Sequence, residues 1–150
     1  MATLSGTSTA EIEAPIERVW ELVENVELAP KWQGGMNSMR ALERDEQGRA
    51  TLCEAGADAK VRTVKTIVRF DYRQAPRRLS WRQEKGDLKS LEGSWELEDL
   101  GGERTRATYR IDVDPGRMLG MMVRGPIEGV IRQALAGARA GELKARIERG

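Results

Sequence analysis

The chain has 150 residues, with 25 Lys and Arg against 24 Asp and Glu, a net charge of +1, and no histidine. Its length fits one domain over residues 1–150, and its 39% hydrophobic and 33% charged residues fit a folded globular protein. The lack of histidine excludes Ser-His-Asp and Cys-His catalysis and every His-containing metal site, and the lone Cys53 excludes an internal disulfide or a thiolate cluster. We therefore expect no metal and no cofactor, and the balanced charge gives no reason to expect nucleic acid as a partner.

The N-terminus and the apolar runs give expectations about location. Residues 1–10 lack the basic start and the apolar stretch of a secretory signal. The run Met118–Val123 is far shorter than the roughly 20 residues that cross a bilayer. We expect a cytoplasmic protein without stable membrane insertion, either a monomer or a homodimer.

The first third of the chain predicts a strand followed by two short helices. Polar and apolar residues alternate over Thr7–Glu13, as in a half-buried strand, and Pro15 ends this pattern. A helix is predicted from residue 16 to Asn25 by four apolar residues at helical spacing, Ile16, Val19, Trp20 and Val23. Residues 26–32 predict a second short helix or turn, which Gly34-Gly35 ends.

From residue 36 the period changes to two, which predicts six consecutive strands at 36–45, 49–57, 60–73, 77–85, 91–99 and 103–113. After Pro115-Gly116 the pattern is helical. The expected apolar stripe of this long helix is Ile127, Val130, Ile131, Ala134, Leu135 and Ala138. The residues expected to face away from it are Arg132, Arg139, Glu142, Lys144 and Arg146. Strands in series without crossover helices indicate an α+β fold in which an antiparallel sheet curls around the last helix and leaves a space between them.

Alternation also predicts which residues face that space. Trp81 and Gln83, Gly93 and Trp95, and Tyr109 fall on the inner face of three neighbouring strands. Three-residue turns at 87–89 and 100–102 would pair Trp81 with Trp95, and would place Gly93 between Gln83 and Tyr109. The missing side chain at Gly93 would then leave room for a ligand. The alternative is that these aromatic residues form an ordinary core and that the glycine marks a bend.

The remaining chemistry-bearing residues have structural interpretations. Cys53 is predicted to be a buried filler rather than a nucleophile, because no histidine is present to activate it. The outward charges of the strands are expected to form a solvated cross-strand face. These charges are Arg62, Arg69, Arg78, Arg82, Glu92, Glu96 and Glu98.

The segment Ile12–Val23 (IEAPIERVWELV), followed by Asn25, Glu27, Pro30 and Trp32, resembles the START-like superfamily. This superfamily includes Bet v 1-like proteins, polyketide cyclases/dehydrases and coenzyme Q-binding proteins. The resemblance covers nearly the whole chain in element order. It implies a helix-grip fold, in which a seven-stranded antiparallel sheet wraps around a long C-terminal helix, with two short helices between the first two strands. It implies a pocket but carries over no catalytic residue.

Three functions remain open. The first is a carrier or sensor for a small hydrophobic ligand such as a lipid, quinone or polyketide, with Gln83 and Tyr109 orienting it. The expected lining is Trp32, Met36, Val68, Phe70, Trp81, Gln83, Gly93, Trp95, Tyr109, Met118, Met121, Met122, Ile127 and Ile131.

The second is a polyketide cyclase or dehydratase in which Tyr109 is the general acid beside an arginine. The arginines of the last three strands have outward parity, so Arg69 or Arg117 would have to reach the cavity. The third is an interaction module of the coenzyme Q-binding type, suggested by the basic residues Arg132, Arg139, Lys144, Arg146 and Arg149.

Overall fold

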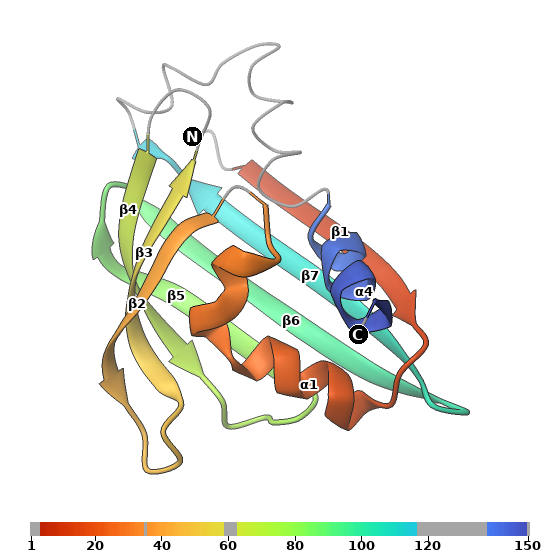
Figure 1. The fold of residues 1–150 in the computed structure, drawn as a ribbon. Coiled ribbons are helices and arrows are strands. Elements are labelled where there is room, and N and C mark those ends of the chain that lie inside the picture. The colour runs from red at the N-terminus through yellow and green to blue at the C-terminus, as the bar shows by residue number, and fades with distance from the viewer. Residues whose placement is uncertain (1–3, 35, 59–62, 117–137, 150) are drawn as a thin grey trace.

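A computed structural model describes residues 4–34, 36–58, 63–116 and 138–149. Seven strands form one antiparallel sheet in the order β1-β7-β6-β5-β4-β3-β2 (Figure 1). The strands are β1 (Leu4–Ile12), β2 (Met36–Arg44), β3 (Ala50–Asp58), β4 (Thr63–Asp71), β5 (Arg78–Gly86), β6 (Ser90–Gly101) and β7 (Arg104–Asp114). The helices are α1 (Ile16–Glu24), the 3₁₀ helix η1 (Val26–Lys31) and α4 (Arg139–Glu148). The predicted α+β helix-grip fold is confirmed, and α1, η1 and α4 lie on the concave side of the curled sheet (Figure 1).

Helix α1 begins where the sequence predicts. Pro15 occupies the position before the helix in an extended conformation, so its missing N–H costs no helical hydrogen bond. The face that α1 buries is Ile16, Val19, Trp20 and Val23. The Trp20 indole Nε1 donates to Glu24 Oε2 at 2.9 Å, one turn later. Helix α1 therefore covers one end of the sheet with an apolar stripe.

The inner face of the sheet has the predicted parity. In β7, Thr105, Ala107, Tyr109, Ile111 and Val113 are all buried. In β4, Val64, Val68 and Phe70 are buried, whereas Ile67 on the other face is only half-buried. Because side chains alternate between the two faces of a strand, this parity aims the aromatic residues of β4 to β7 at the helices.

The predicted register between the last strands is wrong by two residues. Trp95 pairs with Tyr109, and Gly93 pairs with Ile111. The turn is a two-residue one at Gly102 and Glu103, both with positive φ, and a register shift between Asp99 and Gly101 supplies the extra residue. The shorter turn and the register shift together displace the β6–β7 pairing by two residues. Because this number is even, each side chain stays on its predicted face of the sheet.

The pairing of β5 with β6 is also displaced by two residues, so Trp81 pairs with Gly93 and Leu79 with Trp95. The reason lies in the connection between these strands. The Asp87 N–H donates to Lys65 O at 2.9 Å, and the Lys65 N–H donates to Asp87 Oδ2 at 2.9 Å. These bonds hold the start of the connection against β4 rather than β6.

The space above Gly93 is occupied by the Trp81 indole. A Cβ added to Gly93 would lie 2.5 Å from three atoms of that ring. Gly93 therefore allows an aromatic ring to lie flat on the sheet, and the expectation that its missing side chain leaves an empty gap is wrong.

Helix α4 is bound to the edge strand β1. Ala140 N–H donates to Ser8 Oγ at 3.0 Å, and Lys144 Nζ donates to Glu11 O at 2.8 Å. On its inner side α4 buries Arg139, Ala140, Leu143 and Ile147, whereas Ala138 is exposed. The prediction that Arg139 faces outward and Ala138 inward is wrong, because α4 begins at Arg139 after a turn and does not keep the phase expected from residues 127–138. The predicted site residues Met118, Met121, Met122, Ile127 and Ile131 lie outside the described residues.

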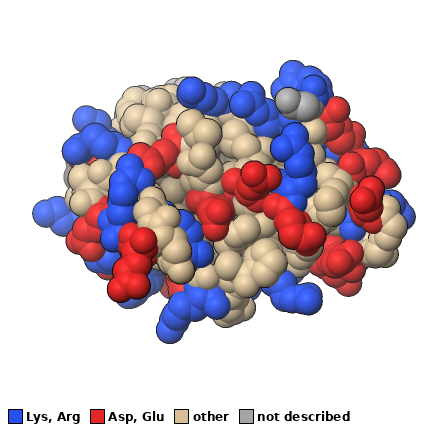
Figure 2. Space-filling model, turned by 60° about the horizontal axis from the view of Figure 1, so that its bottom comes forward, with Lys and Arg blue, Asp and Glu red and all other residues tan. Residues whose placement is uncertain are grey.

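Charges of both signs are interspersed on the face shown in Figure 2. The outer face of the sheet carries cross-strand pairs, including Arg69 with Glu84 at 2.9 Å and Arg78 with Glu96 at 2.6 Å. Of the charges expected on this face, Arg69, Arg78, Glu96 and Glu98 form ion pairs, and Arg62 lies outside the described residues. No helix in the described ranges is long and apolar enough to cross a membrane.

We expect Gly93→Ala to destabilise the protein by about 1–3 kcal/mol, because its methyl group must displace a packed indole. Gly141→Ala is the matched control, since a Cβ there meets nothing within 4 Å. Because Gly141 lies in helix α4, Gly141→Ala should raise the free energy of unfolding by up to about 1 kcal/mol. Urea unfolding measures both changes, and equal stability of Gly93→Ala and wild type would contradict the packing of Trp81 on Gly93.

Candidate functional site: a cavity with one polar end

An apolar cavity of about 120 Å³ lies between the sheet and the segment from α1 to the start of β2. Apolar and aromatic residues form most of its wall: Leu22, Val23, Val26, Ala29, Trp32, Met36, Met39, Ala55, Val68, Phe70, Leu79, Trp81, Leu91, Trp95, Tyr109 and Ile111. The other lining residues are Asn25, Gln33, Gly34, Thr66 and Arg139. An engineered apolar cavity of about 150 Å³ binds benzene, so this slightly smaller space suits a molecule no larger than a compact one-ring compound.

A continuous series of aromatic rings forms one wall of the cavity. Phe70 and Trp81 have ring centroids 5.9 Å apart, Trp81 and Tyr109 5.7 Å, Tyr109 and Trp95 4.9 Å, and Trp95 and Trp32 6.2 Å. The rings come from β4, β5, β7, β6 and the residue after η1, so the series crosses the sheet and continues onto the covering segment. Centroid separations of this size are those of favourable tilted and edge-to-face contacts.

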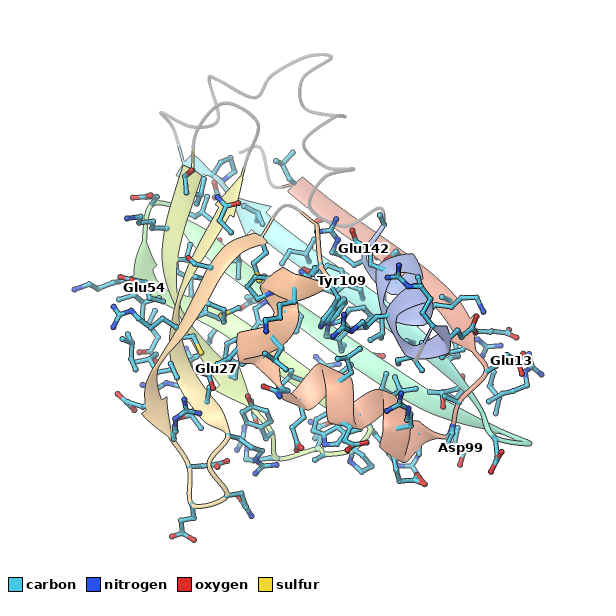
Figure 3. All side chains as sticks on the ribbon, viewed as in Figure 1. Glu13, Glu27, Glu54, Asp99, Tyr109 and Glu142 are labelled. Carbon is cyan, nitrogen blue, oxygen red and sulfur yellow. The ribbon has the colours of Figure 1, made fainter. Side chains whose placement is uncertain are left out.

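The phenol of Tyr109 lies inside the fold beside α4 (Figure 3). Burial raises the pKa of Tyr109 to about 12. The positive charge of Arg139 and a side-chain hydrogen bond with Gln33 act in the opposite direction, whereas Glu142 adds to the rise. Tyr109 therefore keeps its proton at neutral pH and acts as a neutral hydrogen-bonding group.

Two charged side chains of α4 hold the peptide groups of Gly34. The Arg139 guanidinium donates to Gly34 O, and the Gly34 N–H donates to Glu142 Oε2 at 3.0 Å. Arg139 Nε lies 2.9 Å from Glu142 Oε1, so the buried guanidinium has a carboxylate partner. A Cβ at position 34 would lie 2.7 Å from Glu142 Oε2, so a larger residue there would require this carboxylate to shift. The pair fixes the segment that follows η1 against α4.

The structure brings together seven of the expected site residues in the cavity wall: Trp32, Met36, Val68, Phe70, Trp81, Trp95 and Tyr109. Gln83 and Gly93 are not part of this wall. Gln83 is half-buried in β5, and its Nε2 instead donates to Leu88 O at 2.8 Å. Cys53 is fully buried and lies outside the cavity wall, and burial raises the pKa of its thiol to about 11, so its predicted role as a filler fits its environment.

Residues 12–139 match the family described as polyketide cyclase / dehydrase and lipid transport. The chain belongs to this family. Comparison with curated protein sequences finds no match. Solved structures match nearly the whole length of this polyketide cyclase/dehydrase family member. In the three described next, nearly the whole of the other chain is matched as well.

Three solved structures illustrate this similarity. A START superfamily protein from Mycobacterium smegmatis has 21% identity and a TM-score of 0.77, with 97% of each chain covered. A protein from Thermus thermophilus has 18% identity and a TM-score of 0.79, again with 97% of each chain covered. The Zhui aromatase/cyclase of Streptomyces sp. R1128 has 19% identity and a TM-score of 0.79, covering 99% of this chain and 95% of that one. At such identities the likeness establishes the fold and leaves the activity open.

Sequence reasoning missed the polar end of this family member's cavity. Arg139 and Gln33 are only 6% and 8% exposed. Arg139 was predicted to face outward, and Gln33 was not predicted to be part of the site. The local sequence does contain a signal. Arg139 lies four residues before Leu143, which lies four before Ile147, so a helix phased on the two apolar residues places Arg139 inward. Of the basic residues that suggested an interaction module, Lys144 pairs with Glu148 at 2.7 Å, and Arg132 lies outside the described residues.

We expect the chain's two tyrosines, Tyr72 and Tyr109, to remain un-ionised in the folded protein at about pH 11, where free phenols with a pKa of about 10 are ionised. Burial raises the pKa of both, and Tyr72 also donates to Ala50 O at 2.7 Å. The pKa of Tyr109 is higher in the folded protein than in the unfolded chain. With respect to this group, the free energy of unfolding is therefore greatest below about pH 10 and falls as the pH rises towards 12. Phenolate absorbance of folded and urea-unfolded protein measures this difference. Tyr72→Phe isolates Tyr109, and a folded midpoint near the free value would contradict its burial.

Proposed function

We propose that this protein binds a small hydrophobic ligand in the cavity between the sheet and its covering helices, as a carrier or sensor. The apolar space supports this proposal, because a folded core is normally packed with few voids larger than a water molecule. Rigid rings on one side and the Arg139–Glu142 contacts with Gly34 on the other keep the walls apart. The family's description, which includes lipid transport, fits the same use of the fold.

Ala55 offers a direct test, because it is buried in β3 and lines the cavity. The probe is α-methylstyrene, a one-ring hydrocarbon, titrated into the protein and followed by NMR chemical shifts. Ala55→Leu should lower its affinity by more than about tenfold, since losing contact with two methylene equivalents at about 0.8 kcal/mol each corresponds to that factor.

The matched control is Ala41→Leu, on the neighbouring strand β2 but outside the cavity wall, which should bind the probe like wild type. Native mass spectrometry of freshly purified protein complements the titration by detecting a ligand retained from the cell. Absence of binding by wild type, or equal binding by Ala55→Leu, would refute the proposal.

A polyketide cyclase or dehydratase activity is the second candidate, and the position of Arg139 favours it. The outward parity of the strand arginines argued against an enzyme, but Arg139 reaches the cavity from α4 instead. In this alternative the Tyr109 phenol protonates an enolate or a leaving hydroxyl, and the Arg139 charge stabilises negative charge that develops on the substrate.

For this alternative, Tyr109→Phe should reduce turnover of a poly-β-ketone thioester by about 10²- to 10⁴-fold, the usual effect of losing a general acid. Its affinity for α-methylstyrene should be unchanged, because the ring remains. Product analysis by mass spectrometry measures the turnover. Activity that survives the substitution would exclude Tyr109 as the acid. An inactive wild type would exclude the enzymatic alternative and leave ligand binding as the only proposed function.

A further inference from the structure

We propose that the ligand of this cavity is a compact, uncharged ring compound that presents a hydrogen-bond acceptor, such as a conjugated carbonyl oxygen, to the indole N–H of Trp32. This inference rests on the proposed binding function and adds the chemical class of the ligand. It excludes carboxylic acids, including fatty acids, as the preferred ligands.

Trp32 carries the inference because its indole nitrogen is buried without an acceptor. Trp32 follows η1, and its backbone N–H is used by Ala29 O at 3.1 Å. Its side chain lines the cavity and contacts the Trp95 ring. Within the described ranges, Trp32 Nε1 has lost contact with water and has no hydrogen-bond partner. Buried polar groups are nearly always hydrogen-bonded, so an acceptor carried by a molecule in the cavity would satisfy a donor that the described protein leaves unpaired.

Comparison with another indole shows that the fold is able to satisfy such a group. Trp20 is also largely buried, but its Nε1 donates to Glu24 Oε2 at 2.9 Å. Trp32 Nε1 is the one indole nitrogen of the described chain that is buried without a partner. Because an indole N–H is only a donor, the matching ligand atom must be an acceptor.

The charges around the cavity favour a neutral acceptor. Arg139 is the only cationic lining residue among the described ones, and Glu142 Oε1 lies 2.9 Å from its Nε. Its guanidinium also donates to Gly34 O. A ligand carboxylate would bring a second negative charge near Glu142, which already lies against Arg139, and would lose its hydration in an apolar space, and both are unfavourable. A carbonyl oxygen needs only the N–H of Trp32, while the rest of the ring packs against the aromatic wall.

Three probes of similar size separate these possibilities. Acetophenone carries a carbonyl oxygen, α-methylstyrene replaces that oxygen with a CH₂ group of nearly the same shape, and benzoate carries a negative charge. The measured quantity is the ratio of the acetophenone and α-methylstyrene dissociation constants in wild type and in Trp32→Phe. The variant should shift this ratio against acetophenone by about 3- to 10-fold, the usual value of one hydrogen bond. The smaller ring affects both probes alike and cancels in the ratio.

Trp20→Phe is the matched control, because it removes an indole that is not in the cavity wall, and it should leave the ratio unchanged. Benzoate should bind wild type at least tenfold more weakly than acetophenone, about the factor that 1.4 kcal/mol of unpaired charge produces. Binding of α-methylstyrene with an unchanged ratio in Trp32→Phe would overturn this inference and leave the binding function standing. Equal or tighter binding of benzoate would also overturn it. Failure of all three probes to bind wild type would instead refute the proposed function.

A measurement on the wild-type protein avoids dependence on a substitution in the cavity wall. In NMR spectra the Trp32 indole N–H resonance should move downfield when acetophenone is added, because it gains an acceptor. It should move much less with α-methylstyrene. Equal movement with both probes would contradict a hydrogen bond from Trp32 to the ligand.

Discussion

The series of ring contacts from Phe70 through Trp81, Tyr109 and Trp95 to Trp32 is the constraint on which the site depends. It joins four strands and the segment after η1 into one surface. Planar rings held by several neighbours cannot rotate freely into an adjacent void, whereas flexible aliphatic chains can. The same side chains that stabilise the concave face therefore also preserve a space beside it.

Trp81 shows how the sheet accommodates this aromatic surface. Its indole lies on Gly93 of the neighbouring strand, where any Cβ would collide with the ring. Glycine at this position is a cost for strand stability that packing of a large ring offsets. The volume missing at Gly93 is therefore used by the protein itself, and the volume open to a ligand lies farther out, beneath α1, η1 and the start of β2.

The sequence was informative wherever a short-range period determines the outcome. The side-chain alternation in β4 and β7 and the helical spacing in α1 follow from backbone geometry, so the fold and the inner faces could be predicted. Register depends instead on one or two turn residues. The positive φ of Glu103 beside Gly102 and the irregularity after Asp99 are not visible in an alternating pattern. Arg139 was assigned to the wrong face because the helical phase was extended across residues 127–138 into α4.

The groups that give the cavity chemical character lie far apart in the sequence. Gln33 and Gly34 follow η1, Tyr109 belongs to β7, and Arg139 belongs to α4. No linear motif contains them, because they meet only when α4 docks on the edge strand β1 and the charged pair with Glu142 holds Gly34. The curled sheet and its aromatic residues bound the cavity. The fold that provides this sheet is common to solved structures of 18–21% identity. If the cavity binds a ligand as proposed, polar groups such as these and the Trp32 indole would distinguish one ligand from another, and proteins that share the fold can differ in what they bind or convert.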